Sequence, residues 1–544
     1  MNIALRTTSY CLLFCAYVAC DCSCAGGQEA ARESPETVNV AALLETVQRG
    51  DRQARLDALE KLERAGLDDQ LGGQKKQAIE VCADLLDDRD NDVAEAACDV
   101  FAWLDAEAAP ALVRVLRSDN TVAQSRAARA IAAIASRGKA PLEKLDIAIE
   151  PLARLLKGRE QGKRINELYA MSALGPKAIP HLIEQLDADE YTQAIMREGF
   201  IRHGEQAVEP LSDAVRTGNA TTRRNAAHML GFIAWRAPEA LPAMERQALG
   251  PLTEAVDDEH LLAREAALNT LGRMGARAKP ALARIFASLQ RPDALFVPIA
   301  KAVRDIGPEA KHLDALLSAA GRAEPKRDPE RAVWAFGEAI AAAGEAAVEP
   351  AIAALEDDHE RVRKTAMYAL LYLGPTAAPA VPKLIERLND GDQLAAQVLG
   401  EIGPAAEAAV PHLIRRLEHD VPGASRSAIS ISYYSTSALA LAGIGKPALP
   451  AVLKGLEDES EPVRAGCLAA LISMDREVMA PVSKIEPLLH DERPIIRGLS
   501  LQALIKHADT QTIKPILQRL VDDPNGGVAR YAKSYLDKLE PPKD

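Results

Sequence analysis

Cysteine and histidine side chains are the residues of this sequence that could most readily carry out chemistry. The run CDCSC at residues 20–24 offers closely spaced thiols of the kind that bind soft metal ions. The ten histidines form no HExxH motif, no CxxC follows Cys24, and neither GxxxxGKS/T nor GxGxxG occurs in a strand–helix setting. We therefore predict no catalytic residues, no cofactor and no metal site.

Five of the eight cysteines fall between Cys11 and Cys24, and the other three, Cys82, Cys98 and Cys467, lie in apolar stretches far from them. Such an uneven distribution is not that of a disulfide scaffold. Free cysteine packs as a small hydrophobic residue, so we expect all three to be buried in the core. A disulfide between Cys82 and Cys98 is the alternative, because both fall in one repeat of the pattern described below.

The cysteine run lies in a segment typical of protein export. Residues 1–25 combine the positive charge of Arg6 with a short apolar stretch and then small residues, which is the layout of a secretory signal. Residues 17–20, YVAC, resemble the bacterial lipoprotein box, in which Cys20 would be acylated. We expect an exported chain in the periplasm or cell envelope, either cleaved at an ordinary signal site or lipid-anchored through Cys20. Residues 26–38 read as a linker.

From residue 39 to residue 539 the sequence repeats one two-helix pattern about fifteen times. A short helix begins near Pro, as in AVPHLIRRL at 409–417, and an acidic turn follows. The second helix carries Val-Arg and apolar residues spaced by three, four and seven, and Gly or Gly-Pro ends it. One such pair cannot bury both apolar faces alone, so the pairs must stack. The sequence predicts an all-α solenoid, an α–α superhelix, with a short tail at 540–544.

Composition narrows the classes of partner. Apolar residues make up 48% of the chain but aromatic residues only 4%, which suits thin layers of closely packed helices. The net charge of −13 argues against a nucleic-acid partner, because such a protein needs a basic face to neutralise phosphates.

The repeat resembles the HEAT-repeat family, specifically its short bacterial-type repeats, in one recurrent spacing. An Asp stands six residues before an Arg in four units. In the family such pairs form a ladder that links adjacent repeats, and the resemblance implies this role for Asp258, Arg264, Asp357, Arg363, Asp458, Arg464, Asp491 and Arg497. Asp88 and Asp119 have no Arg six residues later, so we expect a ladder that is broken near the N-terminal end and whose pairs are partly exposed.

Some relatives in this superfamily are enzymes, and the sequence lacks their signature. Di-iron hydroxylases of HEAT type use several His-Glu pairs, whereas this chain has only His359-Glu360, in an acidic turn. The phycobilisome-lyase-like branch handles chromophores, and a chromophore-handling enzyme or a chaperone of that kind is the alternative function.

The positions that the repeat leaves free to vary are the candidates for binding. In HEAT-like solenoids the second helices line the concave face. Arg and aromatic residues, which protein interfaces favour, recur on one stripe of these helices. The candidate partner-binding stripe comprises Arg126, Arg129, Tyr169, Arg224, His228, Phe232, Asn269, Arg273, Arg331, Trp334, Tyr368 and Tyr372.

Two irregular segments, 321–331 and 420–436, interrupt the period, and the second brings Tyr433 and Tyr434. Insertions in repeat proteins map to loops, which either belong to a binding edge or are tolerated surface additions. The sequence therefore indicates a non-catalytic scaffold that binds a protein or peptide along its concave face. Its oligomeric state and the identity of its partner do not follow from these residues.

Overall fold

The computed structural model describes residues 39–67, 69–137, 141–158, 165–323, 329–420, 435–475 and 477–539. Within these ranges the chain is all helical and contains no strand. The expected signal, the linker, Cys20 and the tail lie outside the described residues, as do Tyr433 and Tyr434. The helices divide into two compact units, residues 1–159 and residues 160–544, which we describe separately.

Unit 1 consists of helix pairs that stack on their neighbours. Each first helix contacts the next first helix, in the order α2, α4, α6 and α8. Each second helix likewise contacts the next second helix, in the order α3, α5 and α7. The helices of unit 1 are α2 (Val40–Arg49), α3 (Arg52–Leu67), α4 (Lys75–Leu85), α5 (Asn91–Val100), α6 (Ala109–Leu116), α7 (Thr121–Ser136) and α8 (Ile149–Gly158).

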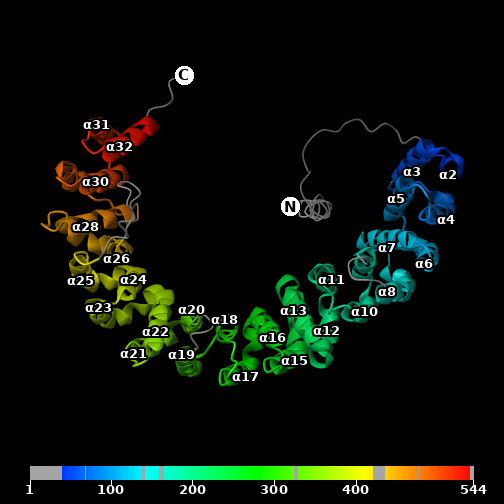
Figure 1. The fold of residues 1–544 in the computed structure, drawn as a ribbon, viewed down its shortest axis with the longest axis horizontal. Coiled ribbons are helices and arrows are strands. Elements are labelled where there is room, and N and C mark those ends of the chain that lie inside the picture. The colour runs from blue at the N-terminus through cyan, green and yellow to red at the C-terminus, as the bar shows by residue number, and fades with distance from the viewer. Residues whose placement is uncertain are drawn as a thin grey trace. The chain divides into compact units, whose positions relative to one another are not determined.

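Unit 2 continues the same pattern in two rows. In Figure 1, α13, α16, α18 and α20 follow one another along one side of unit 2, and α12, α15, α17 and α19 follow along the other. Its helices from α9 to α20 are α9 (Ile165–Ala173), α10 (Ile179–Ile183), α11 (Glu190–His203), α12 (Glu205–Thr217), α13 (Ala220–Arg236), α14 (Leu241–Ala243), α15 (Leu249–Ala255), α16 (Leu261–Met274), α17 (Leu282–Ser288), α18 (Phe296–Ile306), α19 (Leu313–Arg322) and α20 (Pro329–Ala341).

The second-helix row of unit 2 is continuous, because each member from α9 to α32 contacts the next. The remaining helices are α21 (Val348–Ala354), α22 (Glu360–Leu373), α23 (Val381–Asn389), α24 (Gln393–Ile402), α25 (Val410–Arg416), α26 (Thr436–Ile444), α27 (Leu449–Gly455), α28 (Glu461–Ser473), α29 (Val482–Ile485), α30 (Pro494–His507), α31 (Thr510–Leu520) and α32 (Gly526–Leu539). Counted in chain order, the described helices of both units give fifteen pairs, which agrees with the repeat seen in the sequence.

Local signals end and begin these helices as the sequence indicates. Gly374 follows α22 with φ +54°, a conformation that costs glycine little and other residues more. Asp90 caps α5 by accepting hydrogen bonds from the backbone N–H groups of Asp92 and Val93. Pro210 departs from the expected pattern, since it lies inside α12 rather than at its start.

The core lies between the two rows and consists mainly of buried Ala, Leu, Ile and Val. Small residues let helices of one row approach closely, as at Gly337 of α20, where an added Cβ would lie 2.5 Å from Tyr368 Cβ of α22. This close approach explains how a chain with few aromatic residues can pack its core with small side chains.

Candidate partner-binding surface

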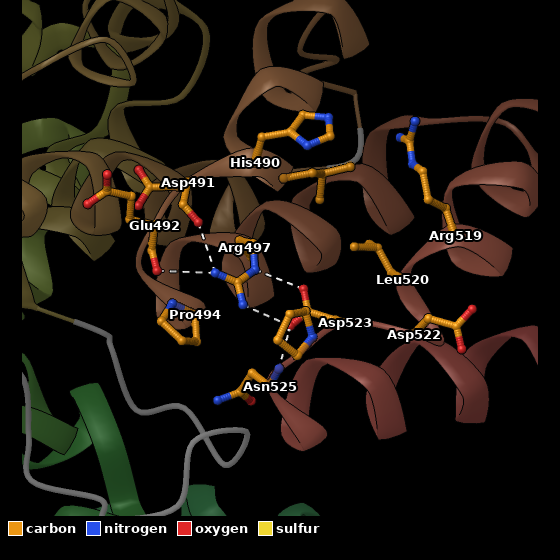
Figure 2. Close-up of a pocket in the computed structure, with 12 residues that line it drawn as sticks. His490, Asp491, Glu492, Pro494, Arg497, Arg519, Leu520, Asp522, Asp523 and Asn525 are labelled. Atoms are coloured by element: carbon orange, nitrogen blue, oxygen red, sulfur yellow. Dashed lines mark hydrogen bonds and ion pairs between the residues drawn. The ribbon is translucent and has the colours of Figure 1, made fainter.

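The arginines of the ladder bind two neighbouring repeats with one guanidinium group. Arg497 of α30 donates to the backbone carbonyls of Asp491 and Glu492 in its own turn, at 2.9 and 3.2 Å. It also donates to both carboxylate oxygens of Asp523 in the next repeat, at 2.8 Å each (Figure 2). These residues line an open hollow of about 650 Å³ between the inter-helix turns. Arg497 therefore lines this hollow as a residue that joins two repeats, not as a free binding group.

Other repeats show the same arrangement, which corrects the predicted pairing in one respect. Arg464 donates to the carbonyls of Asp458 and Glu459 and pairs with Asp491 of the next repeat at 3.0 Å. The side chains of an Asp and of the Arg six residues later therefore do not pair with each other. The Arg instead binds the backbone of its own turn and the aspartate of the following turn.

Arg264 and Arg363 fit this scheme in part. Arg264 is buried and pairs with Asp293 of the next repeat at 2.6 Å. Arg363 donates to the carbonyls of Asp357 and Asp358 at 2.7 and 2.9 Å.

We call each Arg–Asp pair that joins two repeats a rung of the ladder. Two rungs were not predicted from the sequence, because no Asp stands six residues before their arginines. Arg223 follows the Gly218 turn and binds both carboxylate oxygens of Asp258, at 2.6 and 2.8 Å. Arg55 pairs with Asp88, so the predicted break of the ladder near the N-terminal end is only partial. In both cases the arginine also donates to a backbone carbonyl of its own turn, Gly218 or Val47. The residues six positions earlier are Thr217 and Arg49, so the Asp spacing gave no signal for either arginine.

The rung aspartates are held in the charged form. Hydrogen bonds from Arg497 keep the pKa of Asp523 below its ordinary value. Burial alone would raise the pKa of Asp258, but hydrogen bonds from Arg223 and from the His260 backbone N–H outweigh it and lower that pKa. The side chains of Asp258 and Asp523 are 7% and 3% exposed, so these rungs are buried rather than partly exposed as expected.

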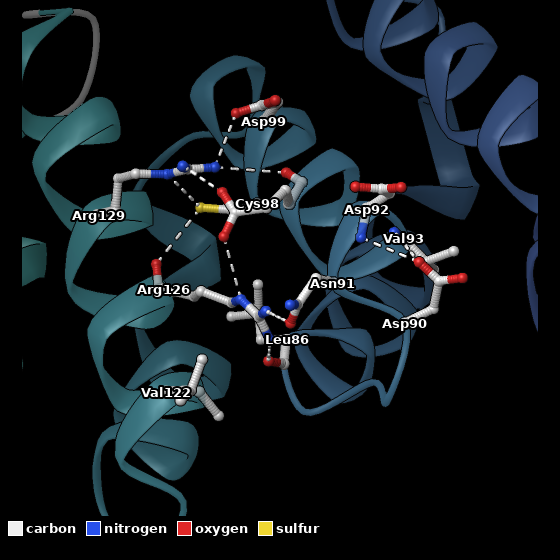
Figure 3. A network of polar contacts seen from close by, with 12 residues as sticks. Leu86, Asp90, Asn91, Asp92, Val93, Cys98, Asp99, Val122, Arg126 and Arg129 are labelled. Atoms are coloured by element: carbon white, nitrogen blue, oxygen red, sulfur yellow. Dashed lines mark hydrogen bonds and ion pairs between the residues drawn. The ribbon is translucent and has the colours of Figure 1, made fainter. Parts of the chain in front are cut away.

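In unit 1 the candidate stripe is occupied by a structural network (Figure 3). Arg126 is only 6% exposed, and it donates to the Leu86 carbonyl at 2.9 Å and to Asn91 Oδ1 at 2.8 Å. Arg129 pairs with Glu95 and with Asp99, the latter at 3.0 Å. The prediction is wrong for Arg126, because a buried side chain with these partners cannot meet a binding partner. Arg129 is half-buried and already neutralised.

In unit 2 the stripe residues of α13 and α16 come together around one aromatic ring. The Arg273 guanidinium carbon lies 5.2 Å from the centre of the Phe232 ring, and that of Arg197 from α11 lies 4.8 Å from it. Burial, together with the charges of Arg224 and Arg273, lowers the pKa of His228. Arg224 stands one turn before His228 on the same face of α13. Asn269 is exposed one turn before Arg273.

A second group lies on α20 and α22. The side chains of Trp334 and Tyr372 are 47% and 40% exposed, and their ring centres are 6.2 Å apart. Tyr368 is half-buried one turn before Tyr372, and Arg331 is exposed one turn before Trp334.

Tyr169 of α9 is half-buried and lies two helices before α13 in the row. The stripe thus resolves into two exposed groups in unit 2, one on α13 and α16 and one on α20 and α22. Arg197 and Trp235, which is 63% exposed on α13, were missed by the sequence reasoning. Trp235 stands three residues after Phe232, and that helical spacing was a signal for it; Arg197 lies on α11, which carries no stripe residue.

The described residues hold no group of three or more histidine, cysteine or acidic side chains placed to bind a metal ion. Cys82, Cys98 and Cys467 are buried free thiols in the core, where burial raises the pKa of Cys98 to about 11. Among the described helices, none is by itself long and apolar enough to cross a membrane; one bent pair, Thr436–Ile444 with Lys446–Gly455, meets those measures only when its two parts are taken together, across a bend of 109°.

Comparisons with known proteins give distant structural similarity alone. No protein-family model matches the chain, and no curated protein matches its sequence. A structure that describes Kap95p binding to RanGDP is 14% identical, with a TM-score of 0.42 over 92% of this chain and 72% of that one. Kap121p is 12% identical, with a TM-score of 0.41 over 94% and 79%. Importin beta in an ammonium sulfate condition is 10% identical, with a TM-score of 0.38 over 92% and 84%.

The architecture of this chain is therefore defined by its own helix contacts. Stacked helix pairs with a continuous row of second helices in unit 2 make it an all-α solenoid of two-helix repeats.

Proposed function

We propose that this chain is a non-catalytic scaffold that binds a protein or peptide on the exposed ridge of the second-helix row of unit 2. The observation that carries the proposal is the pair Arg224 and Arg273, which form no ion pair with any described carboxylate. Arg273 lies against the Phe232 ring, and Arg224 stands one turn before His228 on the same helix as Phe232. Arginine and aromatic side chains at one exposed site are what protein interfaces use as anchors.

The titratable groups whose pKa values are shifted have structural roles in the fold rather than roles in a reaction. The pKa values of Asp258 and Asp523 are lowered by the rungs that join repeats. Burial, with a smaller contribution from Arg202, lowers the pKa of His203 to about 4 and keeps its ring neutral. The causes of these shifts are burial and the hydrogen bonds and charges of neighbouring residues, so each shift has a structural cause.

We also propose that the scaffold acts outside the cytoplasm. The support is the secretory layout of residues 1–25, with YVAC at 17–20 as the point at which a lipid would be attached. Mass spectrometry of the mature N-terminus would test this, because an acylated Cys20, an ordinary cleavage and an intact Met1 differ in mass.

The binding proposal is tested by charge reversal at the ridge. Arg224→Glu with Arg273→Glu should reduce capture of interacting proteins from the native envelope fraction, because the site would then repel the groups it is expected to attract. A matched control is Arg415→Glu with Lys454→Glu, which changes the net charge equally at exposed positions on the first helices α25 and α27. Circular dichroism of all variants would show whether the helices are intact. Equal capture by both doubly substituted chains would contradict the proposal.

A further inference from the structure

The surface on α13 and α16 concentrates positive charge around an aromatic ring. Phe232 has two guanidinium groups within 5.2 Å of its ring centre, from Arg197 and Arg273. Arg224 lies on the same side of α13, one turn before His228. A carboxylate that approached this ring would meet donors from three helices, α11, α13 and α16.

The acidic residues near this site do not neutralise Arg224 and Arg273, which form no ion pair with a described carboxylate. Glu198 pairs with Arg197 at 3.7 Å, and Glu265, one turn before Asn269, forms no ion pair. The stripe arginines of unit 1 are already neutralised, Arg126 by Glu95 and Arg129 by Glu95 and Asp99. Arg224 and Arg273 can therefore each form a new bidentate contact without breaking an old one.

The surface on α20 and α22 has the opposite character. Trp334 and Tyr372 expose large apolar faces, while the charges beside them are paired, Arg304 with Glu338 at 2.8 Å and Lys364 with Glu330 at 3.5 Å. Such a site attracts an apolar or aromatic side chain rather than a charged one.

The two surfaces belong to one row and have a defined separation. Three successive helix contacts, α13 with α16, α16 with α18 and α18 with α20, connect the first site to the second. Packed helices lie about 8–10 Å apart, so the path along the row from α13 to α20 is about 24–30 Å long. An extended peptide rises about 3.3 Å per residue and would cover that span with about eight residues.

We propose that the ridge binds an extended peptide segment with acidic residues that contact Arg224 and Arg273 and an apolar side chain, about eight residues away, that packs on Trp334 and Tyr372. This inference rests on the proposed function and names the chemistry of the partner. It favours a peptide over a nucleic acid, because the cationic site is small and the chain as a whole carries a net charge of −13 that repels a phosphate backbone.

The test measures binding of fluorescein-labelled peptides to the full chain by fluorescence anisotropy at low salt. The probes carry a run of glutamates and a tryptophan separated by about eight residues, in either order along the peptide. We expect saturable binding that weakens as salt is added. Arg224→Glu with Arg273→Glu, or Trp334→Ala with Tyr372→Ala, should each weaken binding at least about tenfold. Arg415→Glu with Lys454→Glu should leave it unchanged.

The spacing provides a second, independent measurement. A peptide with the same residues but a spacer of about three residues should bind at least about tenfold more weakly, because it cannot reach both sites. Equal affinity for the long and short peptides, or tighter binding of a single-stranded oligonucleotide of equal charge, would overturn the inference. If none of the peptides binds while capture from the envelope fraction still depends on Arg224 and Arg273, the inference fails and the proposed function stands.

Discussion

At the scale of single residues, the buried rung between Arg497 and Asp523 is the clearest determinant of local stability. The carboxylate accepts two hydrogen bonds from Arg497 at 2.8 Å and one from the Asn525 backbone N–H at 2.8 Å. Leaving a buried arginine without its partner costs more free energy than the pair contributes when intact.

Asp523→Asn should therefore destabilise the last repeat by about 1–3 kcal/mol, since the amide keeps the shape of the side chain but loses its charge. Hydrogen exchange of the amides in α31 and α32 would measure this, because repeats in a solenoid open locally. Asp522→Asn is the matched control: that side chain is exposed, and removing its charge should change stability by less than about 0.5 kcal/mol. Equal exchange rates in the two variants would show that the rung does not stabilise the repeat.

At the scale of helices, contacts between neighbours of one row decide which small residues can be replaced. Gly337 of α20 lies against the backbone of α22, where an added Cβ would be 2.5 Å from Tyr368 Cβ and 3.2 Å from the backbone nitrogen of Ala369. Alanine favours helix over glycine by about 1 kcal/mol, so the effect of a substitution depends on whether that gain exceeds the cost of the clash.

Gly337→Ala should lower stability by about 1–3 kcal/mol, because α20 or α22 must move to accommodate the methyl group. Gly250→Ala, in α15, has no atom within 4 Å of the added Cβ and should raise stability by up to about 1 kcal/mol. Urea unfolding followed by circular dichroism would give both values. A stabilising effect of Gly337→Ala would mean that the two helices separate more easily than their contact indicates.

At the scale of the whole molecule, the buried histidines and the rung aspartates predict how stability depends on pH. The folded-state pKa of His203 is about 4, so the unfolded chain binds its proton first as pH falls below about 6.5. The lowered pKa values of Asp258 and Asp523 act in a lower range, because their unfolded-state values are about 3.9.

Thermal unfolding should therefore show little change in stability above about pH 6.5, a gradual loss from there to about pH 4, and a steeper loss below about pH 4. His203→Gln should reduce the loss in the upper range and leave the lower range unchanged. A melting temperature that does not vary between pH 7 and pH 3 would contradict both assignments.

The sequence by itself determined the architecture and most of the helix ends. Its period places Ala and Leu at three- and four-residue spacing, and a helix pair with two apolar faces has to stack on others. Gly374 and Asp90 act as a helix stop and a helix cap because these roles depend on residues close together in the chain. The number of repeats could also be counted from the sequence, because each repeat is marked by residues close together in the chain.

Only the tertiary structure decided which residues of the predicted stripe are exposed. Arg126 and Arg224 occupy similar positions on second helices, but Arg126 is buried against Leu86 and Asn91 whereas Arg224 forms no ion pair with a described carboxylate. The ladder depended on structure as well, because Arg223 and Arg55 reach aspartates more than thirty residues away through stacking. Local spacing governs which helices form, while packing between repeats governs which charges find partners and which remain exposed for a ligand.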